Sequence, residues 1–282
     1  MKFQIKEKER VAEEVKEFLR RAPLENSGLT LDGTGINASY QYIILSMLGM
    51  DRILKLKNVN VISGSIFPYL FFLALKENQL TYTNERLEEW AQQWRRWHGV
   101  KPVTTVVKAL YHWAVGQSPL NGNGNRLSFE ATVTPEFSAR TVNDLPANAR
   151  FWLYCVSQKK LVSVHSRGPL SDMPLGLLVK CMTSVPRFFG TSTFQGEEYS
   201  DPIYSPLLNS LRSNLRAECR NLLISNMLFN RRSKSQILVK PHGYNNGRRL
   251  MYRDFLLFIA GLPIPELVDA TRYGLFETQP LP

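Results

Sequence analysis

A serine at the junction of two contrasting segments is the first candidate for chemistry. Val59 to Ser63 is a short run that favours a strand, and it breaks at Gly64 into the apolar stretch Ile66 to Leu75, which predicts a buried helix. A hydroxyl on a sharp strand-to-helix turn is presented to a substrate, and the first helical amides stabilise negative charge. Acyl hydrolysis needs a nucleophile held in this way. We therefore expect Ser63 to be a nucleophile, the alternative being a serine that caps the helix.

A glycine turn provides the second candidate. Asp32-Gly33-Thr34-Gly35 lies about 30 residues before Ser63, after an apolar strand that begins at Gly28. A helix is predicted to follow it, from about Ala38 to Leu48. Backbone amides in such a turn can donate hydrogen bonds to an oxyanion. A structural turn or a nucleotide-phosphate loop would explain the same residues.

A third segment, around Asp201, completes a resemblance to a known family. The run Lys180 to Phe189 contains Ser184-Val185-Pro186 and is followed, after a short loop, by Tyr199-Ser200-Asp201-Pro202. In patatin-like phospholipases a helix ends in an A-S-x-A-x-P-x-x-F-type segment, and the catalytic aspartate follows in a D-G-G or D-G-A turn. The glycine turn resembles the D-G-G-G motif of that family, and the serine turn resembles the S-G-S core of its cytosolic eukaryotic members. The three motifs occur in the family order, and the resemblance covers residues 28–77 and about 151–228.

The resemblance implies a serine acyl hydrolase with two catalytic residues. Ser63 would attack an acyl ester and form an acyl-enzyme, and Asp201 would accept the serine proton. No histidine, metal or cofactor is then expected. This reading requires Ser63 Oγ and the Asp201 carboxylate to lie within hydrogen-bond reach. The ordinary alternative for Asp201 is a turn aspartate before proline.

The resemblance also assigns the residues around this pair. The expected oxyanion hole consists of Gly33, Thr34 and Gly35, and the expected nucleophile elbow includes Gly64 and Ser65. Four residues depart from the family pattern: Val61 and Ser65 stand at the elbow glycine positions, Asn37 replaces a basic residue, and Pro202 replaces a glycine.

The order of predicted elements indicates an α/β fold. Besides the segments above, it comprises an amphipathic helix at 6–21, strands at 151–157 and 161–165, a helix at 174–182 and a strand at 221–228. Strands that alternate with helices predict a mostly parallel sheet covered on both faces. With the resemblance, this becomes a patatin-like three-layer sandwich. We expect a single domain over residues 1–282, with a helical insertion at about 79–150.

Composition narrows the class of protein. Hydrophobic residues make up 44% and charged residues 21%, as in ordinary globular proteins. The N-terminal 21 residues lack the apolar core of a secretory signal, and no apolar run is long enough to span a bilayer, which predicts a cytoplasmic protein. The three cysteines are predicted to be buried thiols. The four histidines lack metal-ligand spacing, although His165 or His242 could still complete a triad.

The net charge of +11 favours anionic partners. An anionic membrane surface with peripheral attachment, or an acidic acyl carrier protein, would suit the basic clusters Arg95-Arg96, Arg231-Arg232 and Arg248-Arg249, and no nucleic-acid-binding signature accompanies them. Three functions stay open: hydrolysis of a lipid acyl ester, acyl transfer or hydrolysis on an acyl thioester, and binding by a catalytically decayed patatin scaffold.

Overall fold

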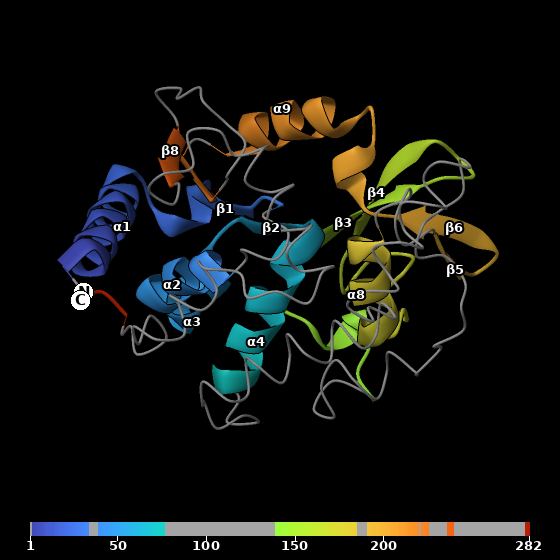
Figure 1. The fold of residues 1–282 in the computed structure, drawn as a ribbon, viewed down its shortest axis with the longest axis horizontal. Helices are drawn as coiled ribbons and strands as arrows, with labels where there is room; N and C mark the ends of the chain where they lie inside the picture. Colours follow the sequence, from blue (N-terminus) through green and yellow to red (C-terminus); the bar gives the residue numbers. More distant parts are fainter. Residues whose placement is uncertain are drawn as a thin grey trace, which may run out of the picture.

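The described strands form one mixed, mostly parallel sheet with flanking helices (Figure 1). The computed structural model describes residues 2–33, 39–76, 139–184, 191–219, 221–225, 236–239 and 280–282. The strands are β1 (Ser27–Leu31), β2 (Asn58–Ile62), β3 (Ala149–Cys155), β4 (Lys160–Val164), β5 (Ser192–Phe194), β6 (Glu197–Ser200), β7 (Asn221–Ser225) and β8 (Gln236–Val239). Their order is β5-β6-β3-β2-β1-β7-β8, and β4 pairs with β3.

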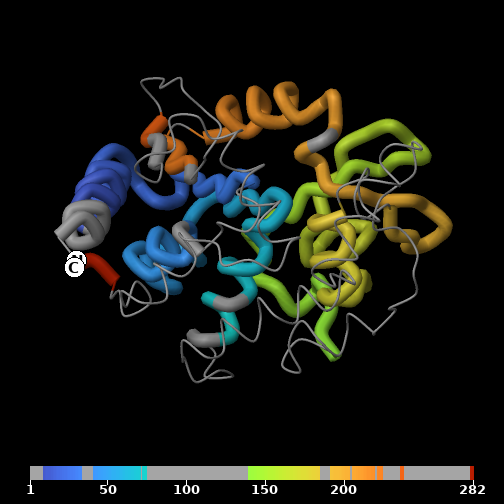
Figure 2. Tube along the Cα trace, in the orientation of Figure 1, coloured from blue at the N-terminus to red at the C-terminus, as the bar shows by residue number. Residues whose placement is uncertain are grey.

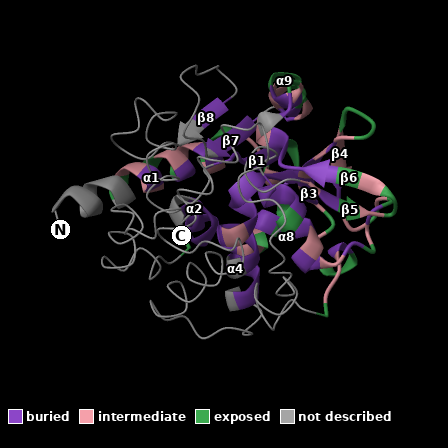
Figure 3. Ribbon diagram, turned by 45° about the vertical axis from the view of Figure 1, so that its right-hand side comes forward, coloured by how far each residue is buried: buried purple, intermediate pink, exposed green. Residues whose placement is uncertain are grey.

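The centre of the sheet is parallel. β2 pairs with β1 and β3, β1 also pairs with β7, and β7 pairs with β8, all in parallel. Figure 2 shows how this brings the early β1 beside the late β7. Every residue of β1 and β2 is buried, as expected for parallel strands covered by helices (Figure 3). The predicted α/β fold with a mostly parallel central sheet is confirmed.

Helices pack on this sheet through different sets of side chains. They are α1 (Lys2–Arg21), α2 (Ser39–Leu48), α3 (Met50–Lys55), α4 (Ile66–Lys76), α8 (Leu175–Thr183) and α9 (Leu208–Glu218). The main core joins α1, α2, α4 and α8 to inward side chains such as Val61 and Phe151. The side chains of Ile62 and Trp152, one residue further along each strand, point the other way and pack against α9.

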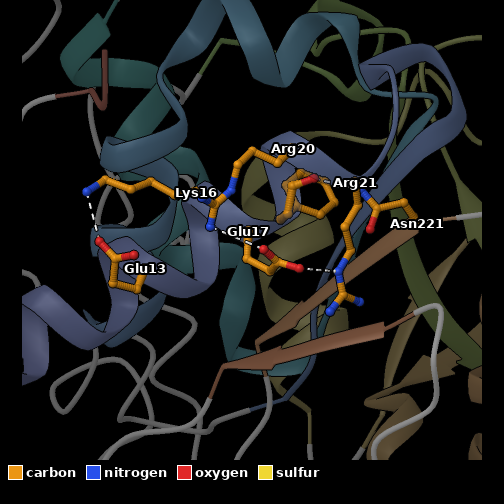
Figure 4. Close-up of polar contacts among 7 residues, drawn as sticks. Glu13, Lys16, Glu17, Arg20, Arg21 and Asn221 are labelled. Carbon is orange, nitrogen blue, oxygen red and sulfur yellow. Dashed lines mark hydrogen bonds and ion pairs between the residues drawn. The ribbon is translucent and has the colours of Figure 1, made fainter.

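The first helix, α1, is held against the sheet near its C-terminal end. Its apolar stripe, Val11, Val15 and Phe18, is fully buried, while the ion pairs Lys16–Glu13, Arg20–Glu17 and Arg21–Glu17 run along its polar side (Figure 4). At the start of β7, Asn221 Nδ2 donates a hydrogen bond of 2.9 Å to the carbonyl oxygen of Phe18. Since exposed ion pairs contribute little, the buried stripe holds this helix to the sheet.

The predicted helices and strands agree with the structure where it describes them. The helix at 6–21 and the strand at 161–165 are α1 and β4, while the strand at 151–157 and the helix at 174–182 are β3 and α8. The strand predicted to Leu228 is described as far as Ser225. Of the helical insertion predicted at about 79–150, the structure describes the C-terminal part, which contains the 3-10 turn Val142–Asp144 and is followed by β3 from Ala149. Its remainder, up to residue 138, lies outside the described residues.

Replacing Phe18 with alanine tests the anchoring of the first helix. Phe18 is fully buried in the main core, so its truncation is expected to lower the free energy of unfolding by about 3–5 kcal/mol. Lys16→Ala is the control, because Lys16 is exposed and its ion pair with Glu13 lies on the surface, where such pairs contribute little to stability. Chemical denaturation of both variants measures the difference. Equal losses would contradict a buried anchor.

Candidate active site

Two strands end against each other along one edge of β3. β2 runs parallel to β3 and finishes with Ile62 opposite Trp152. β6 runs antiparallel and finishes with Ser200 opposite Tyr154. Both lie on the same edge, because the other edge of these β3 residues pairs with β4. One residue of β3, Leu153, therefore separates the two strand ends, and both chains must turn away there.

The next residue of each strand is a predicted site residue. Ser63 follows Ile62 and Asp201 follows Ser200, and Ser63 Oγ donates a hydrogen bond of 2.5 Å to Asp201 Oδ2. Only 5% of Ser63 and 1% of Asp201 is exposed. The predicted proximity of the two side chains is confirmed, and their catalytic roles stay predictions.

The turn at Ser63 carries backbone strain. Ser63 has φ +57°, in the left-handed region that costs a non-glycine residue about 1–2 kcal/mol. The other described non-glycine residues with positive φ, Lys159 and Gln195, lie in hairpin turns, whereas Ser63 lies where β2 enters the 3-10 turn Ser63–Ser65 and then α4. Such strain at the start of a helix is typical of a nucleophile elbow.

Asp201 has a structural contact as well as the contact to the serine. Pro202 begins a 3-10 turn, and Asp201 Oδ1 caps it by accepting a hydrogen bond of 2.9 Å from the Ile203 amide. The Asp201 amide donates to the carbonyl oxygen of Ser184 at the end of α8, at 2.9 Å. The turn-aspartate alternative is thus correct for one carboxylate oxygen. The other oxygen accepts the hydrogen bond from Ser63. Pro202, which stands where the family pattern has glycine, is therefore compatible with the contact between Ser63 and Asp201.

Burial raises the pKa of Asp201 to about 7. Removal of the carboxylate from water is the main cause, and the negative charge of Asp32 adds to it. The hydrogen bonds from the Ser63 hydroxyl and the Ile203 amide oppose the shift, since they favour the ionised form. A carboxyl group poised near neutral pH can both accept and return a proton.

Asp32 connects the glycine turn to the elbow through its backbone. The Asp32 carbonyl oxygen accepts hydrogen bonds from Ser65 Oγ at 3.0 Å and from Gln41 Nε2 of α2 at 2.8 Å. Ser65 is fully buried. The serine that departs from the elbow pattern therefore ties the elbow to the end of β1, a bond that glycine could not make. Val61, the other departure, fits in the main core.

The carboxylate of Asp32 is bound on a second side. Arg212 of α9 donates to it through Nε at 2.9 Å and through Nη2 at 3.1 Å, and the Gly33 amide donates to Oδ1 at 2.8 Å. The predicted elements did not include α9 and gave Arg212 no role. Leu208, Leu211 and Leu215, spaced for one face of a helix, were the signal that would have located it.

Of the three residues expected to form the oxyanion hole, the structure describes only Gly33. The Gly33 amide is occupied by Asp32, and Thr34, Gly35 and Asn37 lie outside the described residues. Gly33 nevertheless lies close to the nucleophile: a Cβ atom there would be 2.4 Å from Ile203 Cδ1 and 3.1 Å from Ser63 Cβ. A side chain at this position would force Ile203 to shift and would press on Ser63.

His165 and His242 are the other candidates for a catalytic partner of Ser63. His165 follows β4, which borders β3 on the edge opposite to β2 and β6, and His242 lies outside the described residues. The three cysteines are buried free thiols, as predicted. Within the described ranges, His, Cys, Asp and Glu residues form no group that could hold a metal ion. No helix in the described part of the chain has the length and apolar character to cross a membrane.

Comparisons with known proteins give no further assignment. No protein-family model and no curated protein matches this chain. The site is therefore defined by its geometry alone. In this α/β protein a buried serine–aspartate pair lies at the carboxyl end of a parallel strand, beside a glycine turn.

Replacing Asp201 with asparagine tests the cost of the buried carboxylate. Its pKa of about 7, against an ordinary 3.8, means that the folded protein keeps the proton as the pH rises from about 4 to about 7. The unfolded chain binds fewer protons there, so this group loses stability as the pH rises. Asp201→Asn is therefore expected to be more stable than the native protein at pH 8 by at least about 1 kcal/mol. Denaturant titrations at pH 8 and pH 4.5 measure this, and an equal difference at both pH values would contradict it.

Proposed function

We propose that this protein is a serine acyl hydrolase that cleaves a lipid acyl ester with the pair Ser63 and Asp201. The observation that carries the proposal is the 2.5 Å hydrogen bond between Ser63 Oγ and a buried carboxylate, made from a strained strand-to-helix turn. The patatin-like three-layer arrangement is part of the same proposal. It is supported by α9 packing opposite the main core and by the order of the three motifs.

The reaction has two steps. Ser63 Oγ bonds to the acyl carbon while its proton passes to Asp201 Oδ2, and the tetrahedral intermediate then collapses as Asp201 returns that proton to the leaving alcohol oxygen. In the second step water attacks the acyl-enzyme, Asp201 takes the water proton, and the proton finally returns to Ser63 as the acid leaves. A carboxyl group with a pKa of about 7 can both accept the proton and give it back.

Stabilisation of the oxyanion is assigned to the glycine turn. Thr34 and Gly35 are the proposed amide donors, and each such donor lowers the barrier by about 3 kcal/mol. The Gly33 amide would have to exchange its bond to Asp32 for one to the substrate. The close approach of Gly33 to Ser63 supports a role for this turn.

The partners follow from chemistry and charge. An acyl lipid is the proposed substrate, and a net charge of +11 would draw the protein to an anionic membrane surface or to an acidic acyl carrier protein. The basic clusters invoked for this lie outside the described residues. A thioester substrate or an acceptor other than water would use the same first step. The contact between Ser63 and Asp201 favours all of these reactions over a decayed binding scaffold.

A fluorophosphonate probe tests the nucleophile. The native protein is expected to be labelled at Ser63, and Ser63→Ala to lose labelling together with hydrolysis of short nitrophenyl esters by at least about 10³-fold. Ser213→Ala is the matched control, because Ser213 is an exposed serine on α9. Labelling and ester turnover are followed by mass spectrometry and absorbance. Label on another residue, or full activity in Ser63→Ala, would reject the proposal.

The pH dependence tests Asp201. Because the ionised carboxylate accepts the serine proton, the labelling rate is expected to rise with pH and to reach half its maximum near the Asp201 pKa of about 7. Rates measured from pH 5 to pH 9 with the native protein give the midpoint. Asp201→Asn, with no group to ionise, is expected to label slowly at every pH. A native rate independent of pH would exclude Asp201 as the acceptor.

A further inference from the structure

Arg212 reaches the site from a separate element. It lies on α9, whose leucines Leu208, Leu211 and Leu215 pack against Ile62 and so hold the helix over the end of β2. The Arg212 side chain is 11% exposed and the Asp32 side chain 1% exposed, so the ion pair between them is largely withdrawn from water. Two parallel contacts, from Nε and Nη2, fix the carboxylate plane.

The position of the Asp32 carboxylate matters for the glycine turn. The oxygen that accepts Arg212 Nη2, Oδ1, also accepts the Gly33 amide, and the Asp32 carbonyl oxygen accepts Ser65 Oγ from the elbow. Arg212 is therefore linked through one residue to both halves of the site. A shift of Asp32 would move the glycine turn relative to Ser63.

We propose that Arg212 is a positioning residue, which holds the Asp32 carboxylate in place and thereby sets the position of Gly33 and the electrostatic environment of the Ser63–Asp201 pair. The inference rests on the proposed hydrolase function and deepens it. Arg212 contacts the Asp32 carboxylate through Nε and Nη2, and its effect on the reaction is assigned to this contact.

The electrostatic part follows from the two buried carboxylates. The charge of Asp32 raises the pKa of Asp201, and the guanidinium of Arg212 offsets that charge. The elements packed around Asp201 carry other charges: Arg216 and Glu218 on α9, Arg150 on β3, which is paired with Glu218, and the exposed Lys180 on α8. Of these charged groups and Asp32, it is the negative charge of Asp32 that raises the pKa of Asp201.

Arg212→Gln removes the cation with little loss of volume. The fluorophosphonate labelling rate at pH 7 is expected to fall at least about tenfold, because Gly33 loses its fixed position beside Ser63. The midpoint of the pH profile is expected to rise by about one unit, because the uncompensated Asp32 charge disfavours ionisation of Asp201. Arg167→Gln is the matched control, since Arg167 is an exposed arginine between β4 and α8. Rates are expressed per folded molecule, from circular dichroism melts.

Two further variants separate positioning from folding. In Asp32→Asn/Arg212→Gln both charges are absent, so the pH midpoint is expected to return to the native value or below it, because no buried charge is left unpaired. Arg212→Lys keeps the positive charge but cannot make the two parallel hydrogen bonds of a guanidinium. This variant is therefore expected to keep the native midpoint of the pH profile and to be labelled more slowly. If Arg212→Gln does not fold, these two variants decide the question.

The outcomes are distinct. Labelling of Arg212→Gln at the rate and midpoint of Arg167→Gln would overturn the inference while leaving the proposed function intact. So would an Arg212→Lys variant with the native rate, or a double variant whose midpoint lies above the native one. A native protein that is not labelled at Ser63 would overturn the proposed function and the inference together.

Discussion

The arrangement of the site depends on one constraint of sheet pairing, the meeting of β2 and β6 along the same edge of β3. One strand runs parallel to β3 and the other antiparallel, so their ends face each other with one β3 residue between them. Neither strand can continue. The chain leaves β2 through a strained residue, Ser63, and leaves β6 through a proline turn that begins at Asp201. A contact between residues 138 positions apart then follows from register.

The same constraint buries a carboxylate at a cost to stability. Asp201 is enclosed by β3, α8 and the turn after β6, where water cannot solvate its charge. The hydrogen bonds from Ser63 and the Ile203 amide offset part of this cost but not all of it, so the pKa stays near neutral. An acid that must exchange protons with a serine benefits from this balance, whereas a purely structural turn would gain nothing from it.

The two buried acids of the site are held differently. Asp32 is bound by a guanidinium and by its neighbouring amide, while Asp201 is bound by a hydroxyl and an amide. Asp32 thus serves as a structural anchor, while burial leaves the pKa of Asp201 at about 7. The departures from the family pattern fit this organisation, because Ser65 adds a bond to Asp32 and Pro202 sets the turn that Asp201 caps.

The sequence by itself determined several of the elements and the two candidate residues of the pair. Apolar periodicity located α1, and the strand–turn–helix patterns located α4, Ser63 and the glycine turn, because these features depend on neighbours in the chain. Only the tertiary structure decided which edge of β3 carries β6, how Asp201 divides its two oxygens, and that Arg212 on α9 binds Asp32. Strand register and ion pairs between distant segments depend on packing of the whole sheet, and no local pattern specifies them.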